Sequence, residues 1–433
     1  MLTIIKNRIR TGVITSRSSS VLSGIVANVF NQGVTVIVQL ASLPIFLHYW
    51  GAARYGDWII ISAVPAYFAV SDIGIVSVAI NKICMFHARG QVEQANVTLQ
   101  SACSGVTGIL LLGTLIGVVF VLRSDGNAQS WTLLLLVVTA LLNLYTGLFD
   151  AAFRVADRYA AGVVLMSLGR LGEWLASVAC VAAGGGIVAV AACACGARAA
   201  FQLVILVAST RIGSGLRWGW SNSSFVELKS LVPHGAAFLG FPLGNALSIQ
   251  GMTIVVGHFI GVREVVAFNA YRTLSRSITQ VITTVSRAVW PRFSSLYAKG
   301  QHGEAKELRL KAERGVVIAA GGALVLLVAV SRPLIDIWGR GKLPYEPFVL
   351  VSFLLVALIT SLYQVKLVAL MSTNRHTTVS VQFCAISIAA VCVGWALSTF
   401  AGMIGPVMAV VIAELVIFAS VTRAFRRMTV GGF

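Results

Sequence analysis

The chain has 433 residues, of which 57% are hydrophobic and only 11% are charged, and its mean hydropathy is +0.87. These values exclude an ordinary water-soluble globular protein and are typical of a protein embedded in a membrane. The net charge of +18 does not indicate nucleic-acid binding, because the basic residues lie in short segments between apolar stretches and form no basic soluble domain.

Apolar segments long enough to cross roughly 30 Å of hydrocarbon as α-helices recur along the whole chain. In chain order they lie near 21–47, 58–81, 99–122, 131–153, 161–183, 186–208, 235–257, 264–290, 315–336, 346–371, 377–398 and 402–422. We therefore predict an all-α polytopic membrane protein with about twelve transmembrane helices. The basic, polar N-terminus lacks a small-residue cleavage site and leads into a full-length span, so we expect no cleavable signal peptide.

Lysine and arginine are distributed unevenly between the two sides of these spans. With the N-terminus on the cytoplasmic side, 21 of the 33 basic residues fall in inner segments, six fall in outer segments and six lie within the spans. This asymmetry follows the positive-inside rule and predicts that both termini are cytoplasmic. Insertion topology and anionic lipid headgroups thus account for most of the basic excess.

Two short motifs recur at an offset of 210 residues. HYWGAARYGDW begins at His48 and HFIGVREVVAF at His258, while FHARGQVEQAN begins at Phe86 and LYAKGQHGEAK at Leu296. The first pair falls in the predicted outer loop after the first helix of each half, and the second pair falls in the inner loop after the second helix. We therefore predict two six-helix lobes related by a pseudo-two-fold axis along the membrane normal.

The repeat defines the predicted domains. The N-terminal lobe spans 1–208 and contains helices one to six, and a cytoplasmic linker at 209–234 holds a short amphipathic stretch, FVELKSLV, expected along the inner interface. The C-terminal lobe spans 235–433 and ends in a short basic tail. Two such lobes can rock around a central cavity, which is alternating access, so a transporter is the leading class.

Proline and glycine residues predict where the helices bend and pack. Pro44, Pro65 and Pro242 are expected to interrupt helices one, two and seven, because proline removes a backbone hydrogen bond. Gly240 and Gly244 are four residues apart and form a small-residue surface that favours close helix packing.

Six basic residues lie inside the predicted spans, far from the usual positions of charge in a membrane protein. They are Arg170, Arg198, Arg272, Arg276, Arg287 and Lys366. Each mid-membrane charge costs about 2.5 to 3.5 kcal/mol on insertion scales, so these side chains are expected to face water, partner groups or a ligand. We take all six as candidate residues of a substrate cavity.

Three of these arginines lie in one segment, YRTLSRSITQVITTVSRAV at 271–289. At about 100° per residue, Arg272, Arg276 and Arg287 share one helix face within about 60°. Guanidinium groups bind phosphate oxygens bidentately and keep their charge, so a column of them suits an anionic group that crosses the membrane. The alternative is that Arg272 and Arg287, nearer the two ends, extend to the headgroups.

Polar residues at helical spacing mark the first predicted helix and its counterpart in the second half. Asn28, Gln32, Thr35 and Gln39 recur amid apolar residues, and Asn245 corresponds to Thr35 at the 210-residue offset. Such residues either hydrogen-bond between helices or contact the hydroxyl groups of a sugar. We take Asn28, Gln32, Gln39 and Asn245 as candidate substrate-binding residues.

Only four acidic residues lie in or near the spans: Asp72, Asp150, Glu173 and Glu414. We assign Asp72 and Glu173 as candidates for ion coupling. The structural alternatives are an ion pair between Asp72 and an arginine of helix eight, and a pair between Glu173 and Arg170 three residues away.

Enzyme chemistry has little support in the sequence. The seven cysteines lie in or beside the spans without a paired metal-ligand spacing, and the longest outer loop, around 337–345, is too short for a catalytic domain. We therefore expect no catalytic residue, no metal and no cofactor.

The segments LPIFLHYWGAARYGDWII and SDIGIVSVAI resemble the polysaccharide transport family of the multidrug/oligosaccharidyl-lipid/polysaccharide superfamily, particularly bacterial O-antigen flippases. Members of this family have a proline near the end of helix one, a loop of the pattern Y-x-G-x2-x-Y/F-G-x-W, and D-x-G within helix two. The matching residues are Pro44, the segment 49–58, and Asp72 with Gly74. In the second half, Arg263 and Glu264 replace the more usual small residues.

This resemblance implies two lobes that form a V around a cationic vestibule in a bacterial inner membrane. It further implies that the substrate is a polyprenyl-diphosphate-linked oligosaccharide, an O-antigen or exopolysaccharide repeat unit, moved from the cytoplasmic to the periplasmic leaflet. The expected partners are this substrate, membrane lipids and the polymerase and chain-length machinery, with no nucleic acid, and we expect a monomer. The alternative is a multidrug or cation antiporter of the same superfamily, which would need an aromatic cavity with unpaired carboxylates.

Overall fold

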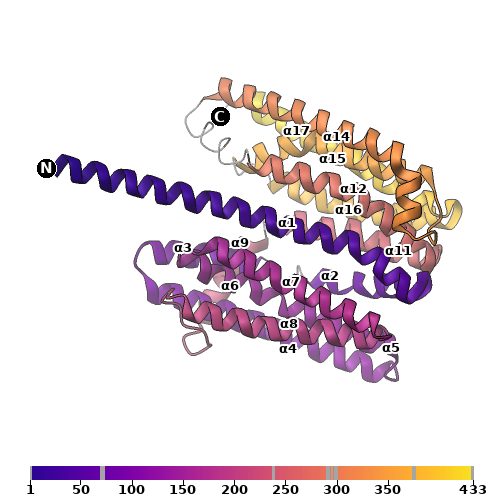
Figure 1. The fold of residues 1–433 in the computed structure, drawn as a ribbon, viewed down its shortest axis with the longest axis horizontal. Coiled ribbons are helices and arrows are strands. Elements are labelled where there is room, and N and C mark those ends of the chain that lie inside the picture. Colours follow the sequence, from indigo (N-terminus) through magenta and orange to yellow (C-terminus); the bar gives the residue numbers. More distant parts are fainter. Residues whose placement is uncertain are drawn as a thin grey trace. The chain divides into compact units, whose positions relative to one another are not determined.

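The structure is a computed structural model that describes the backbone of residues 2–68, 74–236, 239–288, 293, 296, 301–372 and 377–430. Side chains are described from Ser23 onward for most of these ranges. Two predicted site residues are affected, because Asp72 and the side chain of Arg287 lie outside this description. Within the described ranges every regular element is a helix (Figure 1).

The chain divides into two compact units, which we call the first unit (Met1–Ala41 and Ser71–Gly235) and the second unit (Ser42–Val70 and Ala236–Phe433). Helix α1 (Leu2–Ala63) contributes to both units. The other helices of the first unit are α3 (Ile75–Ala88), α4 (Val92–Arg123), α5 (Ala128–Leu142), α6 (Leu144–Val155), α7 (Tyr159–Ala182), α8 (Ile187–Arg211) and α9 (Phe225–Ala236).

The second unit contains α2 (Pro65–Phe68), α10 (Gly240–Ala246), the π-helical segment η1 (Leu247–Gly251), α11 (Met252–Phe259), α12 (Val262–Ala288), α14 (His302–Trp338), α15 (Pro347–Ser372), α16 (Thr377–Ala401) and α17 (Ile404–Val430). Helix α17 packs against α15 and α16, and α12 and α14 both pack against α15 (Figure 1). In the first unit α8 packs against α5 and α7, and α4 packs against α3 and α5.

The structure confirms an all-helical polytopic membrane protein. Nine helices of the described residues are long and apolar enough to cross a membrane, and they correspond to nine of the twelve predicted spans. The predicted span at 58–81 is divided between the end of α1, α2 and α3, and the span at 235–257 is divided between α10, η1 and α11. The span at 264–290 forms α12, whose charged and hydroxyl-bearing residues lower its apolar character. The full count of twelve and the two-lobe symmetry stay predictions.

The chain breaks inside the predicted outer loop after the first helix, but the loop is reduced to a single residue with helix directly on both sides of it. Helix α1 runs through Pro44 and is interrupted only at Gly51, whose φ is 71°. In the second half, Gly261 has a φ of 140° between α11 and α12. Both residues lie in the region that favours glycine, and they are 210 residues apart, so the repeated motif places the same break in both halves.

The inner turn repeats equally well. The amide of Gln91 donates to the Phe86 carbonyl at 2.9 Å, and the amide of Gln301 donates to the Leu296 carbonyl at 3.0 Å. Gln91 and Gln301 then serve as the N-cap residues of α4 and α14. The 210-residue offset is therefore a repeat of backbone conformation as well as of sequence.

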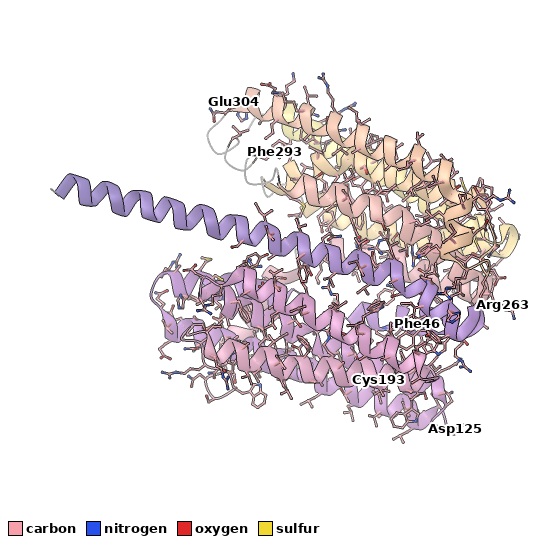
Figure 2. All side chains as sticks on the ribbon, viewed as in Figure 1. Phe46, Asp125, Cys193, Arg263, Phe293 and Glu304 are labelled. Atoms are coloured by element: carbon pink, nitrogen blue, oxygen red, sulfur yellow. The ribbon has the colours of Figure 1, made fainter. Side chains whose placement is uncertain are left out.

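The end of α1 belongs to the second unit, although the predicted N-terminal lobe includes it. The ring of Phe46 lies 5.2 Å from the Trp50 ring and 5.6 Å from the Tyr55 ring. A Cβ atom added at Gly56 would overlap the Val262 carbonyl oxygen, so this part of α1 approaches the start of α12 closely. Figure 2 labels Phe46 and Arg263 in this region. The predicted lobes at 1–208 and 235–433 stay a prediction.

The predicted linker at 209–234 is held on the first unit by side chains of α4. Asn96 accepts a hydrogen bond from the Arg217 amide at 2.7 Å, and Gln100 donates to the Arg217 carbonyl at 3.0 Å and accepts from the Asn222 amide at 2.6 Å. Both α4 side chains are buried. The linker backbone therefore takes its hydrogen bonds from one helix of the first unit.

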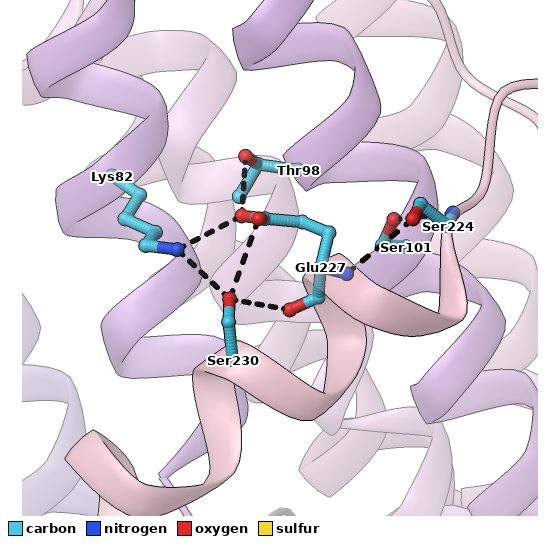
Figure 3. A network of polar contacts seen from close by, with 6 residues as sticks. All are labelled: Lys82, Thr98, Ser101, Ser224, Glu227 and Ser230. Atoms are coloured by element: carbon cyan, nitrogen blue, oxygen red, sulfur yellow. Dashed lines mark hydrogen bonds and ion pairs between the residues drawn. The ribbon is translucent and has the colours of Figure 1, made fainter.

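Helix α9, which contains the predicted amphipathic stretch, is held by an ion pair (Figure 3). Lys82 lies 3.0 Å from the Glu227 carboxylate and donates to the Ser230 hydroxyl at 3.0 Å, and Thr98 donates to the same carboxylate at 2.9 Å. Burial by itself would raise the pKa of Glu227, but the hydrogen bonds from Lys82 and Thr98 outweigh it, so the pKa lies below its ordinary value.

Close helix packing at Gly240 agrees with the small-residue surface that the sequence predicts. A Cβ atom at Gly240 would overlap the backbone carbonyl oxygen of Ser380 on α16, and one at Gly244 would lie 2.6 Å from the Phe383 ring. The backbone of α10 thus approaches α16 directly. Pro242 lies in α10 itself, and the helix changes to the π-helical segment η1 five residues later.

We predict that Gly240→Ala destabilises the second unit, because its methyl group would force the backbones of α10 and α16 apart. The expected loss is about 1 to 3 kcal/mol, the usual cost of overpacking. Thermal unfolding of the detergent-purified protein measures it. Gly196→Ala on α8 is the matched control, since a Cβ atom there meets nothing within 4 Å, and equal melting temperatures for the two variants would contradict the packing.

We also predict that Glu227→Gln releases the linker, because it removes the charge that holds Lys82. Hydrogen–deuterium exchange of residues 214–228 should become faster, whereas Glu93→Gln at the exposed start of α4 should leave it unchanged. In the unsubstituted protein the pKa of Glu227 is lowered by folding. Its contribution is therefore full above the unfolded value of about 4.3 and is lost as the pH falls through the lower folded value. This role would be refuted if Glu227→Gln left the exchange of residues 214–228 unchanged. It would also be refuted if a fall in pH changed that exchange only by its intrinsic pH dependence.

Candidate functional site

A cavity of about 320 Å³ lies within the second unit, between α10, η1, α12, α15, α16 and α17. Its polar lining comprises Asn245, Ser248, Arg272, Ser275, Arg276, Thr279, Thr283, Thr360, Tyr363, Gln364, Ser387 and Glu414. The remaining lining residues are aromatic or aliphatic, among them Phe241, Phe353 and Phe383. A pocket with apolar walls and a few convergent polar groups is the usual form of a small-molecule site.

One face of α12 supplies the cationic wall of this cavity. Arg272, Arg276, Thr279 and Thr283 line it, in agreement with the face on which the helical wheel places them. The apolar residues between them, such as Ile278, are buried elsewhere. The arginine face of α12 is therefore turned into the bundle of its own unit.

Arg272 is fixed by the irregular backbone beside it. Its guanidinium donates to the Ile249 carbonyl at 2.5 Å, to the Thr253 hydroxyl at 2.9 Å and to the Asn269 side chain, and lies 5.3 Å from the Phe268 ring centre. Ile249 belongs to the π-helical segment η1, and its carbonyl also accepts hydrogen bonds from the Met252 amide and the Thr253 hydroxyl. Most of the donors of Arg272 are thereby used by the protein.

Arg276 differs from Arg272 in having no acceptor among the residues that the structure describes. Within the described part of the chain, no hydrogen bond or ion pair involves its guanidinium, although the residue lines the cavity and is only partly exposed. Asn245, Ser275 and Thr279 line the same space. A buried guanidinium without a protein partner is costly, so an anionic group entering the cavity would be stabilised there.

Glu414, which is not among the residues predicted for the site, lies in the same cavity. Its carboxyl oxygen Oε1 accepts hydrogen bonds from Thr360 at 2.5 Å and from Tyr363 at 2.6 Å. Among the described residues no cation lies within ion-pair distance of it. Like Asp72 and Glu173, Glu414 is a carboxyl inside a predicted span, and this position in the sequence is a signal of a functional residue.

The basic residues of the first unit are paired differently from the prediction. Glu173 contacts Arg198 of α8 in an ion pair, and Arg170 donates to the Thr35 hydroxyl of α1 at 2.6 Å. The proposed pair between Arg170 and Glu173 is therefore wrong, since a partner on the neighbouring helix takes the carboxylate. Arg198 is buried, and its charge is compensated inside the first unit.

The polar residues of the first helix also lie in the first unit. Asn28 donates to the Gly24 carbonyl at 2.8 Å and lies 3.3 Å from the Tyr159 hydroxyl of α7. The amide nitrogen of Gln32 is buried and has no hydrogen-bond partner among the described residues, and Gln39 is half-buried on the same helix. Interhelical hydrogen bonding is thus observed at Asn28, while the expected contacts to sugars stay a prediction.

Two further candidates remain. Lys366 lies on α15 outside the cavity lining, with its ammonium group 5.4 Å from the Phe418 ring centre. Asp72 is outside the described residues, so its predicted role in ion coupling is unaffected by the contacts above. No group of three or more histidine, cysteine or acidic side chains that could hold a metal occurs in the part of the chain that the structure describes.

Comparison with known proteins identifies the family of the chain and proteins that share its fold. The pattern of one family, described as "Polysaccharide biosynthesis protein", matches residues 60–339. No curated protein matches the chain.

Several solved structures share the fold over nearly the whole chain. An inward-facing multidrug resistance MATE family transporter of the MOP superfamily has a TM-score of 0.69 at 12% identity, covering 90% of this chain and 98% of that one. The lipid II flippase MurJ in an inward closed conformation has a TM-score of 0.69 at 11% identity, covering 93% and 88%. The MATE multidrug transporter DinF-BH has a TM-score of 0.66 at 13% identity, covering 95% and 94%. At these identities the likeness shows the fold alone.

We predict that Glu173→Gln strongly destabilises the first unit, because it leaves the buried Arg198 without its counter-charge. Breaking one partner of a buried pair typically costs about 3 to 5 kcal/mol. The double variant Glu173→Gln with Arg198→Gln should recover most of this loss, since no unpaired charge remains. Thermal unfolding of the unsubstituted protein, the two single variants and the double variant forms a double-mutant cycle, and a purely additive result would mean that the two side chains do not interact.

Proposed function

Because this chain belongs to the polysaccharide biosynthesis protein family, whose pattern covers residues 60–339, we propose that it is a flippase for a polyprenyl-diphosphate-linked oligosaccharide. The substrate moves from the cytoplasmic to the periplasmic leaflet of a bacterial inner membrane, and no covalent bond changes. The fold shared with transporters and with a lipid II flippase is consistent with this proposal.

The observation that carries the proposal is the guanidinium of Arg276, which has no partner among the described residues and lies in a cavity that already contains Arg272. Arginine forks match phosphate oxygens in two parallel hydrogen bonds, and the guanidinium stays charged in a desolvated site. Arg272 is fixed by the Ile249 carbonyl, so it supplies fixed positive charge, while Arg276 supplies free donors. Together they suit a diphosphate better than a neutral ligand.

The remaining polar groups suit the sugar next to the diphosphate. Asn245, Thr279 and Gln364 offer donors and acceptors within the same cavity, and such groups pair readily with hydroxyl groups. The volume of about 320 Å³ is at the lower end of small-molecule sites, so the cavity accommodates the diphosphate and the adjoining sugar rather than a whole oligosaccharide. The polyprenyl chain stays in the lipid phase.

Translocation in this proposal is alternating access, in which rocking of two lobes exposes the cavity first to one side of the membrane and then to the other. Holding the diphosphate on Arg276 removes the main electrostatic barrier, because an isolated anion in hydrocarbon is very unfavourable. Ion coupling through Asp72 or Glu173 is part of the proposal. A charge moved across the membrane supplies about 2.3 kcal/mol per 100 mV.

A cation antiporter is the second candidate function, and one observation favours it. Glu414 provides a carboxyl without a cationic partner among the described residues, in a cavity with the aromatic side chains of Phe353 and Phe383. Against it stand Arg272 and Arg276 in the same cavity, because they repel a cationic ligand. The two functions therefore make opposite demands on Arg276.

We predict that Arg276→Gln lowers polysaccharide export about 10- to 150-fold, the effect of losing one charge-assisted contact of roughly 1.5 to 3 kcal/mol. Export is measured as surface polysaccharide in a host that lacks its own flippase, together with the lipid-linked precursor that accumulates inside. Arg276→Lys should be intermediate, because lysine keeps the charge and loses the planar fork.

Arg332→Gln is the matched control, since it removes the same charge from the exposed surface of α14 in the same unit. It should export normally. Full export by Arg276→Gln at equal protein level would rule out the phosphate role. The antiporter predicts a different pattern, in which Glu414→Gln abolishes binding of an organic cation to the purified protein and Arg276→Gln strengthens it.

A further inference from the structure

A groove lies on the opposite faces of two helices that enclose the cavity. A groove of about 720 Å³ runs between α16 and α17, and we call it the α16–α17 groove. Its walls include Ala385 and Ile386 of α16 and Leu415, Val416 and Ala419 of α17. The cavity is lined instead by Glu414 and Ile417 on α17 and by Phe383 and Ser387 on α16, so different residues of the two helices form the two spaces.

The groove is apolar along most of its length and cationic at one end. At this end Thr378 and Gln382 line the groove on α16. Arg423 and Arg427 line the same end on α17. The stretch of α17 from Ile412 to Arg427 covers roughly 22 Å at 1.5 Å per residue. One leaflet of hydrocarbon is about 15 Å thick, so the groove is long enough for an acyl chain and the headgroup above it.

The two arginines have no acidic partner among the described residues. Neither Arg423 nor Arg427 forms an ion pair with any residue in the described part of the chain. Helix α16 contains no acidic residue, and the only one on α17 is Glu414, which lines the cavity. Like charges one helical turn apart repel each other, so an anion between them would relieve an unfavourable contact.

The walls are open to their surroundings. Ile412, Leu415 and Val416 are each about half exposed in the protein alone, and in a membrane lipid chains would contact them. A phosphate group supplies the negative charge that would balance Arg423 and Arg427. Two arginines one helical turn apart can share its oxygens. A single molecule with an acyl chain and a phosphate head therefore complements both parts of the groove.

We propose that the α16–α17 groove binds an anionic glycerophospholipid, with an acyl chain along the apolar walls and the phosphate on Arg423 and Arg427. The general excess of basic residues on one side of a membrane protein explains why arginines end α17, but it does not explain which of them line a groove. Arg426 ends the same helix at nearly the same depth and does not line it. This site is independent of the flippase function.

The test compares lipids on the purified, detergent-solubilised full chain. Phosphatidylglycerol should raise the melting temperature and remain bound in native mass spectrometry, whereas phosphatidylcholine of the same chain length should do neither. The double variant Arg423→Gln with Arg427→Gln should bind phosphatidylglycerol roughly 30-fold more weakly, since each basic residue near an anionic headgroup contributes about fivefold. Arg426→Gln is the matched control and should bind like the unsubstituted protein.

Two further arms identify what is bound. Ala419→Phe fills the groove and keeps both arginines, so it should also lose phosphatidylglycerol; Ala419 is exposed, so the core is undisturbed. Soluble glycerol 3-phosphate should have no effect. The proposal is overturned if the double variant retains the lipid, if Arg426→Gln loses it equally, or if glycerol 3-phosphate reproduces the shift. If the double variant does not fold, the proposal is tested by Ala419→Phe alone, and retention of phosphatidylglycerol by that variant overturns it.

Discussion

A charge inside a membrane must be compensated, and this constraint organises both units of the protein. In the first unit Arg198 is paired with Glu173 and Arg170 is bonded to Thr35, so their charges are held by neighbouring helices. In the second unit Arg276 has no protein acceptor among the described residues. The free energy cost of leaving such a group unpaired is large. Arg276 therefore determines that the cavity favours an anionic ligand.

The backbone of the second unit is arranged around that cavity. The π-helical segment η1 presents the Ile249 carbonyl to Arg272, and Gly240 lets α10 approach α16 closely. They hold the helices that position Arg276 and Glu414, so the site depends on irregular backbone as much as on the side chains that line it.

Helices α16 and α17 separate two environments of different chemistry. One set of their residues lines the cavity with Ser387 and Glu414, and another lines the α16–α17 groove with apolar walls and two arginines at its end. We assign the first to the transported headgroup and the second to a bound phospholipid. A lipid in the groove would neutralise Arg423 and Arg427, and thereby favour the packing of these two helices.

The sequence by itself determined the membrane class, nine of the spans, the 210-residue repeat and the arginine face of α12, because hydropathy and helical periodicity are local properties. Only the tertiary structure decided which charges are compensated, since a partner such as Glu173 for Arg198 comes from another helix. It also reduced the expected outer loop to a break at Gly51 and placed Glu414 in the cavity that Arg272 and Arg276 line. Contacts between distant segments leave no periodic signal along the chain.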